Sequence, residues 1–176
     1  SKTFVTKRPI VERMTGLSGK AGADAPLGDV TVDDATIFMT EFKNGALGVF
    51  EATRFAAGHK NDMSFEINGD KGSLRFSFER MNELLYMSRE DEEDVQGFRL
   101  IQASEGCHNY AANWWPAGHV LGYENTFANE FYEYYEAIAN DRQTSPSFED
   151  GVKCCQVLDA VELSCERRQW VNVDEV

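Results

Sequence analysis

Apolar and polar residues alternate through the middle of the chain with the two-residue period of β-strands. Segments with this period cover residues 34–42, 46–55, 63–68, 73–78, 83–88 and 98–103. Asn44-Gly45 separates the first two segments, and residues 69–72, which begin and end with glycine, separate the next two. Both are strong signals for hairpin turns. The pattern therefore predicts an antiparallel meander of about six strands with no βαβ rhythm.

Both faces of the first predicted hairpin carry apolar side chains. Ile37 and Met39 point to one side of the strand, while Phe38 points to the other. A sheet with one solvated face shows a cleaner alternation of apolar and polar residues. We therefore expect helices on one face and a second layer on the other, most simply another subunit packed sheet against sheet. The alternative cover is residues 8–32 together with an upstream segment.

The last third of the chain has the period of a helix. Two sets of residues recur at i, i+4, i+7 and i+11, namely Phe127, Phe131, Tyr134 and Ile138 in the first set and Cys154, Leu158, Val161 and Cys165 in the second. These stripes predict two amphipathic helices with their apolar faces in the core. Asn125 or Thr126 would cap the first helix, and Ser147 with Asp150 would cap the second. Residues 170–173 predict a short final strand or a docked tail.

These elements define the expected fold class. It is α+β, with an open, largely antiparallel β-sheet of about six or more strands and two long C-terminal helices on one face. A length of 176 residues is enough for one hydrophobic core, so residues 1–176 are expected to form a single domain. Residues 2–7 alternate like a further strand at the start of the chain.

One glycine-rich segment and one acidic run invite a functional interpretation. Residues 16–29 contain glycines and Lys20, but a phosphate-binding Walker loop would need glycine where Met14 stands and Ser or Thr where Ala21 stands. A flexible connector is the better interpretation. The acidic run at residues 90–94 is expected to be a solvated loop between strands, with a cation site as the lesser alternative.

Charge and cysteine content exclude several classes of protein. A net charge of −13 opposes binding to nucleic acid, because phosphates require clustered Lys and Arg. No apolar run approaches the roughly 18 residues that span a bilayer, and the first residues do not resemble a signal peptide.

The cysteines are expected to be free thiols. A helix would place Cys154 and Cys165 on the order of 16 Å apart, too far for a disulfide. Free thiols indicate a cytoplasmic location. Cys107-His108 and His119 lack the spacing of metal ligands, so no metal site is expected.

Six segments resemble, in order and spacing, parts of the C-terminal domain of the Gfo/Idh/MocA family of NAD(P)-dependent oxidoreductases. They are residues 33–48, 50–54, 66–74, 122–127, 146–151 and, as the last piece, 157–161 with 170–171, within a resemblance that covers residues 33 to 173. The segment at residues 66–74 is similar to the family's GxxGxL hairpin, and residues 114–127 are similar to the approach to its long helix. This resemblance implies an open antiparallel sheet whose exposed face assembles subunits as a homo-oligomer.

The resemblance also implies an N-terminal Rossmann domain that binds NAD or NADP, followed by a Glu-Lys-Pro motif and a helix carrying Asp and His. Lys7-Arg8-Pro9 does not match that motif, so no catalytic and no cofactor-binding residue is carried over. We expect the chain to be the C-terminal part of a sugar or polyol dehydrogenase, truncated upstream, inactive alone and without bound cofactor. The alternative is a stand-alone interaction or oligomerisation module. The sequence contains no GxSxG, HExxH or Cys–His pattern that would favour a hydrolase.

One wall of a substrate pocket would remain in this chain. The candidates are Trp115, whose ring could stack on a sugar, and His119 and Tyr123, which can hydrogen-bond to hydroxyl groups. The structural alternative is that the tryptophans pack over the sheet and that His119 only holds a loop together. Arg54, at the end of the second strand, is a further candidate, for which a surface ion pair is an equal explanation.

Overall fold

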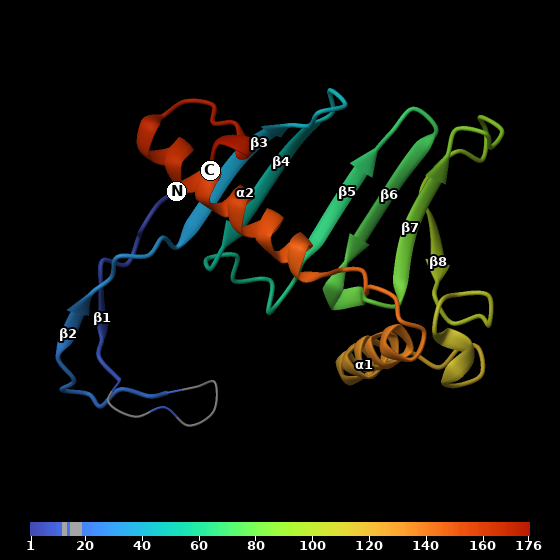
Figure 1. Cartoon of the computed structure of the whole chain (residues 1–176), viewed down its shortest axis with the longest axis horizontal. Helices are drawn as coiled ribbons and strands as arrows, with labels where there is room; N and C mark the ends of the chain where they lie inside the picture. Colours follow the sequence, from blue (N-terminus) through green and yellow to red (C-terminus); the bar gives the residue numbers. More distant parts are fainter. Residues whose placement is uncertain (12–13, 15–18) are drawn as a thin grey trace. The chain divides into compact units, whose positions relative to one another are not determined.

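The computed structural model describes residues 1–11, 14 and 19–176. The chain divides into two compact units (Figure 1). Unit 1 combines Ser1–Ala57 with Phe148–Val176, and unit 2 is the continuous segment Gly58–Ser147. Antiparallel strands and two long helices confirm the expected α+β class, with the strands distributed over three sheets. The expectation that residues 1–176 form a single domain stays a prediction.

Unit 1 is built on two short ladders and one helix. Its elements are β1 (Lys7–Pro9), β2 (Leu27–Asp29), β3 (Ala35–Glu41), β4 (Leu47–Thr53), α2 (Phe148–Arg167) and η3 (Val173–Glu175). β1 pairs with β2 and β3 pairs with β4, both antiparallel. The strand predicted at residues 2–7 is wrong, because Lys2 makes only an isolated bridge to Ala35 and pairing begins at Lys7. The connector predicted at residues 16–29 ends in β2, and residues 15–18 lie outside the described residues.

The turn between β3 and β4 differs from the predicted two-residue turn. The amide of Phe42 donates to the Ala46 carbonyl at 2.8 Å, which leaves three residues in the loop. Gly45 closes a turn on the Phe42 carbonyl at 2.7 Å and has φ +85°. A type I turn followed by one residue in the left-handed region is the usual three-residue hairpin loop. Glycine is needed at this single position because it has no Cβ to oppose a positive φ.

The β3–β4 ladder carries apolar side chains on both faces, as the sequence predicted. Phe38 and Phe50 face each other across the ladder, with their rings stacked at 5.1 Å between centroids. The opposite face carries four exposed apolar side chains: Ile37, Met39, Leu47 and Val49. We call this set the exposed ladder face. Met39 and Val49 are directly paired across the two strands, so the set is contiguous.

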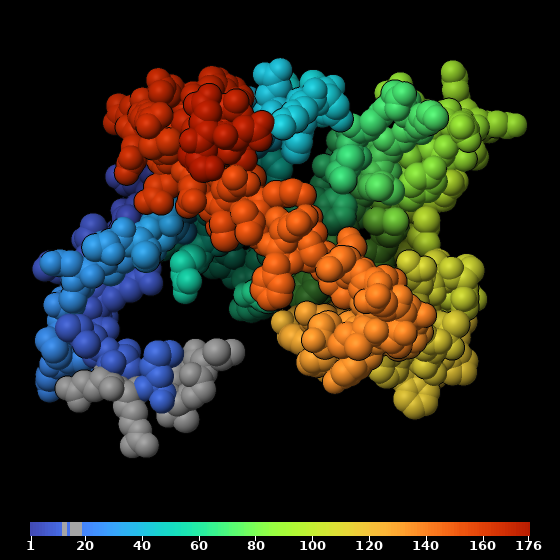
Figure 2. Space-filling model, in the orientation of Figure 1, coloured from blue at the N-terminus to red at the C-terminus, as the bar shows by residue number. Residues whose placement is uncertain are grey.

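The C-terminal tail docks onto unit 1 instead of forming a strand. The segment after α2 ends in η3, which packs beside α2 (Figure 2, dark red). Gln156 of α2 donates to the Val176 carbonyl at 3.2 Å, and Lys43 forms an ion pair with Asp174 at 2.9 Å. Of the two interpretations of residues 170–173, the docked tail is therefore correct.

Unit 2 is a four-stranded antiparallel sheet followed by a helix. Its elements are β5 (Ser64–Asn68), β6 (Gly72–Ser77), η1 (Phe78–Arg80), β7 (Glu83–Ser88), β8 (Arg99–Gln102), η2 (Ala111–Asn113) and α1 (Tyr123–Ala139). The strands pair in the order β5-β6-β7-β8, which confirms the predicted meander for this part of the chain. The acidic run at residues 90–94 lies in the loop between β7 and β8, as expected.

The predicted core face of α1 is wrong. Phe127, Phe131 and Ile138 are about half exposed or more, whereas Asn129, Glu133 and Ala137 turn toward the rest of unit 2. Periodicity identifies an apolar stripe but not what covers it, and in unit 2 the polar stripe binds the preceding loop. Likewise on α2, Cys154 and Leu158 of the predicted stripe are exposed and Ala160 is buried. Among the described residues, neither helix has an apolar stretch long enough to cross a bilayer.

The helix starts also differ in detail. Gly122 occupies the cap position of α1, and its amide donates to the Asn125 side chain at 2.8 Å. Asn125 therefore acts three residues inside the helix and not at the cap that the sequence predicted. α2 begins at Phe148, which places Ser147 at the predicted cap position.

Candidate functional site

The loop that carries the predicted substrate residues is fastened to α1 by polar contacts. The Tyr110 hydroxyl donates to Glu133 at 2.9 Å, and the Trp114 indole donates to Asn129 at 3.3 Å. Arg142 binds the other carboxylate oxygen of Glu133 at 2.9 Å. Hydrogen bonding from Arg142, and then from Tyr110, lowers the pKa of Glu133, while the bond to Glu133 raises the pKa of Tyr110. These contacts fix the η2 end of the segment between η2 and α1.

His119 folds back on its own loop. Its Nδ1 lies 2.8 Å from the Pro116 carbonyl oxygen. A carbonyl oxygen can only accept, so Nδ1 carries the proton, and in the neutral ring Nε2 is an acceptor. The ring is exposed, which leaves Nε2 available to accept a hydrogen bond from a hydroxyl group. The contact also matches the structural alternative, in which His119 holds the loop.

Tyr123 lies in an aromatic cluster at the start of α1. Its ring meets Phe78 at 5.8 Å and Phe127 at 5.1 Å between centroids, both edge to face. Edge-to-face packing orients a ring and contributes about 0.5–1.5 kcal/mol per pair beyond area burial. The side chain is 56% exposed, so the cluster orients the phenol without covering it.

Trp115 is 63% exposed, more than the 56% of Tyr123. Leu121, near the other end of the loop, is held by Asn82, whose amide group both donates to and accepts from the Leu121 backbone at 2.8 and 3.0 Å. Within the described residues, no hydrogen bond joins Trp115, His119 and Tyr123 to one another. They share only one loop and its junction with α1. Their role as one wall of a substrate pocket therefore stays a prediction.

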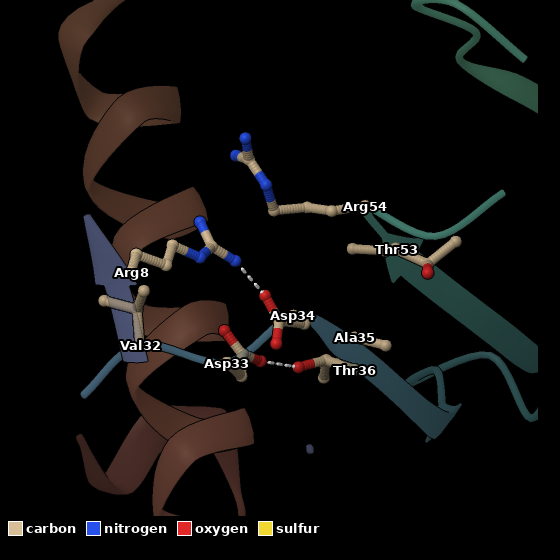
Figure 3. A pocket seen from close by; sticks show the side chains of 9 residues that line it. Arg8, Val32, Asp33, Asp34, Ala35, Thr36, Thr53 and Arg54 are labelled. Carbon is tan, nitrogen blue, oxygen red and sulfur yellow. Dashed lines mark hydrogen bonds and ion pairs between the residues drawn. The ribbon is translucent and has the colours of Figure 1, made fainter. Parts of the chain in front are cut away.

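A pocket in unit 1 surrounds the buried carboxylate of Asp34. The pocket has a volume of about 430 Å³ and is lined by Arg8, Asp33, Thr36, Thr53 and Arg54, among others (Figure 3). Asp34 receives backbone N–H donors from Phe4 at 2.7 Å and Val5 at 2.8 Å, and it forms an ion pair with Arg8. Asp33, its neighbour, is exposed and binds the hydroxyl of Thr36 instead.

These contacts determine the charge state of Asp34. The amide of Val5 contributes most to lowering the pKa of Asp34 below its ordinary value of 3.8, burial opposes it, and the Phe4 amide and the charges of Arg8 and Arg54 add to the lowering. A carboxylate with several donors is held ionised. Asp34 therefore connects the N-terminal segment, β1 and β3 electrostatically.

Arg54 follows β4 and extends from its end on the Arg8 side of the pocket (Figure 3). Its backbone amide donates to the Asp34 carbonyl at 2.9 Å. Sequence reasoning identified Arg54 but missed Asp34 and Arg8. The available signal was the pair Asp33-Asp34 directly before a strand, because side chains of neighbouring residues point to opposite sides and one of the two turns inward. No spacing rule, however, links Asp34 to an arginine 26 positions earlier.

Comparison with known proteins defines the class. Residues 2–173 match the family model described as the oxidoreductase family, C-terminal alpha/beta domain. The chain therefore belongs to the Gfo/Idh/MocA oxidoreductase family, as its C-terminal domain, which confirms the resemblance found in the sequence.

Individual relatives agree with this assignment. A levoglucosan dehydrogenase of Pseudarthrobacter phenanthrenivorans is 36% identical over 99% of this chain. A crystal structure of an oxidoreductase domain protein from Kribbella flavida is 48% identical, with a TM-score of 0.88 over 98% of the chain. A levoglucosan dehydrogenase in complex with NADH and L-sorbose is 35% identical, with a TM-score of 0.87 over 98%. The chain spans only 45%, 44% and 43% of these three proteins, respectively.

Proposed function

We propose that this chain is the C-terminal, substrate-side and subunit-assembly domain of an NAD(P)-dependent dehydrogenase that acts on small sugars or polyols. The observation that carries the proposal is the near-complete match of the chain to proteins crystallised with NADH, one of them also with L-sorbose. The chain spans less than half of those proteins, and its own sequence contains no dinucleotide-binding fingerprint. The nicotinamide that accepts the hydride therefore binds to another part of the enzyme, and the catalytic groups also lie outside this chain.

The role of this domain is to bind and orient the sugar. Trp115 provides an exposed aromatic face, against which the apolar C–H face of a sugar ring can pack. His119 offers an acceptor at Nε2, and Tyr123 offers a hydroxyl on an oriented ring. One stacking surface and two hydrogen-bonding groups on a single loop suit a polyhydroxylated ring.

Replacing Trp115 with alanine in the intact dehydrogenase should raise KM for the sugar by about tenfold, since one well-packed contact contributes roughly 1–3 kcal/mol. The KM for NAD(P) should stay unchanged, because the loop is assigned to the sugar alone. Steady-state kinetics with each substrate varied in turn measures both effects. Trp170→Ala is the matched control, since Trp170 is equally exposed, at 66%, but lies in unit 1. Equal sugar KM values in the Trp115 variant and the unmodified enzyme would contradict the role of this loop.

Subunit assembly is assigned to the exposed ladder face. Its four apolar side chains, between 57% and 71% exposed, form one patch bordered by Glu41 and Glu51. A contiguous apolar patch with a charged border is typical of a protein interface. A second copy of the same face is the simplest partner, because a twofold interface is self-complementary.

Light scattering of the chain should give the mass of a dimer or a larger oligomer. Val49→Lys should shift it to a monomer, because a buried, unpaired ammonium costs several kcal/mol at an interface core. Val95→Lys is the control, since Val95 is 68% exposed and lies in the loop between β7 and β8 of unit 2. A monomeric mass without substitution would exclude this face as a self-association surface. If the chain forms an oligomer but the longer protein that contains it has no NAD(P)-dependent activity, the result would instead favour the alternative of a stand-alone interaction or oligomerisation module.

A further inference from the structure

Three potential metal ligands meet at one end of the unit 2 sheet. His59 precedes β5, Asp62 lies two residues before β5, and Glu79 lies in η1 directly after β6. The imidazole Nδ1 of His59 is 3.5 Å from a carboxylate oxygen of Asp62 and 3.4 Å from one of Glu79. The three potential ligand atoms lie within 4.8 Å of one another. The antiparallel pairing of β5 and β6 therefore joins residues that are distant in the sequence.

The two carboxylates are held from behind by the chain. Glu79 receives the backbone amides of Lys60 at 2.5 Å and Asn61 at 3.2 Å, both on Oε1. Asp62 receives the Ser77 hydroxyl at 2.9 Å and the Glu79 amide at 3.3 Å, both on Oδ1. In each carboxylate the second oxygen is the one that faces His59. Ligating carboxylates in metal sites are oriented in the same way by outer hydrogen bonds.

Both carboxyl groups are kept ionised by these contacts. Hydrogen bonds from the amides of Lys60 and Asn61 lower the pKa of Glu79. Burial raises the pKa of Asp62, but the bond from Ser77, the Glu79 amide and the charge of His59 together lower it. Two carboxylate oxygens and one imidazole nitrogen thus lie within 4.8 Å of one another.

The distances around His59 are long for a direct ion pair and fit the spacing of ligands in a metal site. A charge-assisted hydrogen bond from an imidazolium to a carboxylate has a length of about 2.7–2.9 Å. The distances from Nδ1 of His59 to the two carboxylate oxygens are longer than that and nearly equal to each other. Ligands about 2.1 Å from a tetrahedral zinc ion stand roughly 3.4 Å apart along each edge of the tetrahedron. The two observed distances match two such edges, and the Asp62 and Glu79 oxygens lie within 4.8 Å of each other.

We propose that His59, Asp62 and Glu79 form a binding site for a divalent first-row transition-metal ion of the Zn²⁺ type. One imidazole nitrogen and two carboxylate oxygens suit Zn²⁺, whereas Mg²⁺ and Ca²⁺ prefer oxygen ligands alone. His59 is 59% exposed, so a fourth position remains open to water or to a ligand. The site is independent of the sugar-binding role, although Glu79 directly follows Phe78, whose ring contacts Tyr123.

Zinc binding can be measured on the full chain by calorimetry and by the imidazole ¹⁵N shifts of its three histidines. The exposed thiols would compete for zinc, so the reference protein carries Cys107→Ser, Cys154→Ser and Cys155→Ser. One zinc ion per chain is expected, with a shift of the Nδ1 signal of His59 alone. His59→Ala should weaken binding by more than about tenfold, since even the loss of an outer partner of a ligand costs about 10–100-fold.

Two further variants separate the site from general effects. His119→Ala should bind zinc as the reference does, because His119 lies outside the cluster. Ser77→Ala, which removes only the support behind Asp62, should weaken binding by a smaller factor than His59→Ala. Binding that is equally tight in His59→Ala, or zinc uptake without a shift at His59, would overturn the proposal. The absence of any binding at sub-millimolar zinc would do the same.

Discussion

Replacing Asp34 with alanine should lower the melting temperature of the protein by about 10 °C, because two part-buried backbone amides lose their acceptor and Arg8 loses its partner. The side chain of Asp34 is fully buried. Its loss would remove the acceptor for two backbone amides and for Arg8 at once. Differential scanning calorimetry or circular dichroism with temperature measures the effect.

Asp33→Ala is the matched control for this substitution. Asp33 is adjacent in the sequence but exposed, and it contacts only the hydroxyl of Thr36 among the described residues. A surface hydrogen bond contributes little, so the melting temperature should change by no more than about 2 °C. Equal losses in the two variants would show that the buried carboxylate of Asp34 is not what stabilises the N-terminal segment.

The same carboxylate predicts a dependence on pH. The pKa of Asp34 is lowered on folding from its ordinary value of 3.8, so the folded state binds its proton less readily than the unfolded state. The stabilisation is therefore fully present above pH 3.8 and is lost as the pH falls through the lower, folded-state pKa. The difference in melting temperature between the protein and Asp34→Asn should shrink correspondingly in acid.

Replacing Gly72 with alanine should destabilise unit 2 by about 3 kcal/mol, at the upper end for overpacking substitutions. An added Cβ would lie 2.2 Å from the backbone carbonyl oxygen of Met87, on the neighbouring strand β7. A backbone atom in a paired strand cannot move aside as a flexible side chain can. The ladder between β6 and β7 must therefore separate at this point. Urea denaturation followed by circular dichroism measures the loss of stability.

Gly69→Ala, in the same hairpin, is the control for Gly72→Ala. The nearest atom to an added Cβ at Gly69 is the Gly72 carbonyl oxygen at 3.7 Å, an ordinary contact. Its backbone does not have a positive φ, so alanine is tolerated there without strain. The Gly69 variant should remain within about 1 kcal/mol of the unmodified protein. A comparable loss at both positions would place the sensitivity in the turn and not in the contact between strands.

Local features of this fold were predictable from the sequence, because they depend on neighbouring residues. The glycines at residues 45, 69 and 72 located both hairpins, and alternation located the strands that flank them. The two-sided apolar pattern of Phe38 and Met39 was also correct. The loop length at Gly45 was not predictable, because Asn-Gly fits both a two-residue loop and a three-residue loop.

Features that depend on distant residues were not predictable in the same way. The outward orientation of Phe127 and Phe131 results from polar contacts between the opposite side of α1 and the preceding loop. The Asp34–Arg8 pair and the cluster around His59 have no characteristic spacing, because pairing between strands brings their members together. Trp115 and His119 were recognisable only through a resemblance to a family, since exposed aromatic and imidazole side chains have many roles.

The division of unit 1 between the two ends of the chain has a cost in chain entropy. Residues 1–57 and 148–176 must meet for this unit to form, and the whole of unit 2 is the loop that their meeting closes. Closure becomes less favourable as such a loop lengthens, with a logarithmic dependence on the number of flexible residues. If unit 2 folds first, it replaces that flexible loop with a compact body whose ends are already fixed. Folding of unit 2 therefore reduces the chain entropy that is lost when the two parts of unit 1 come together.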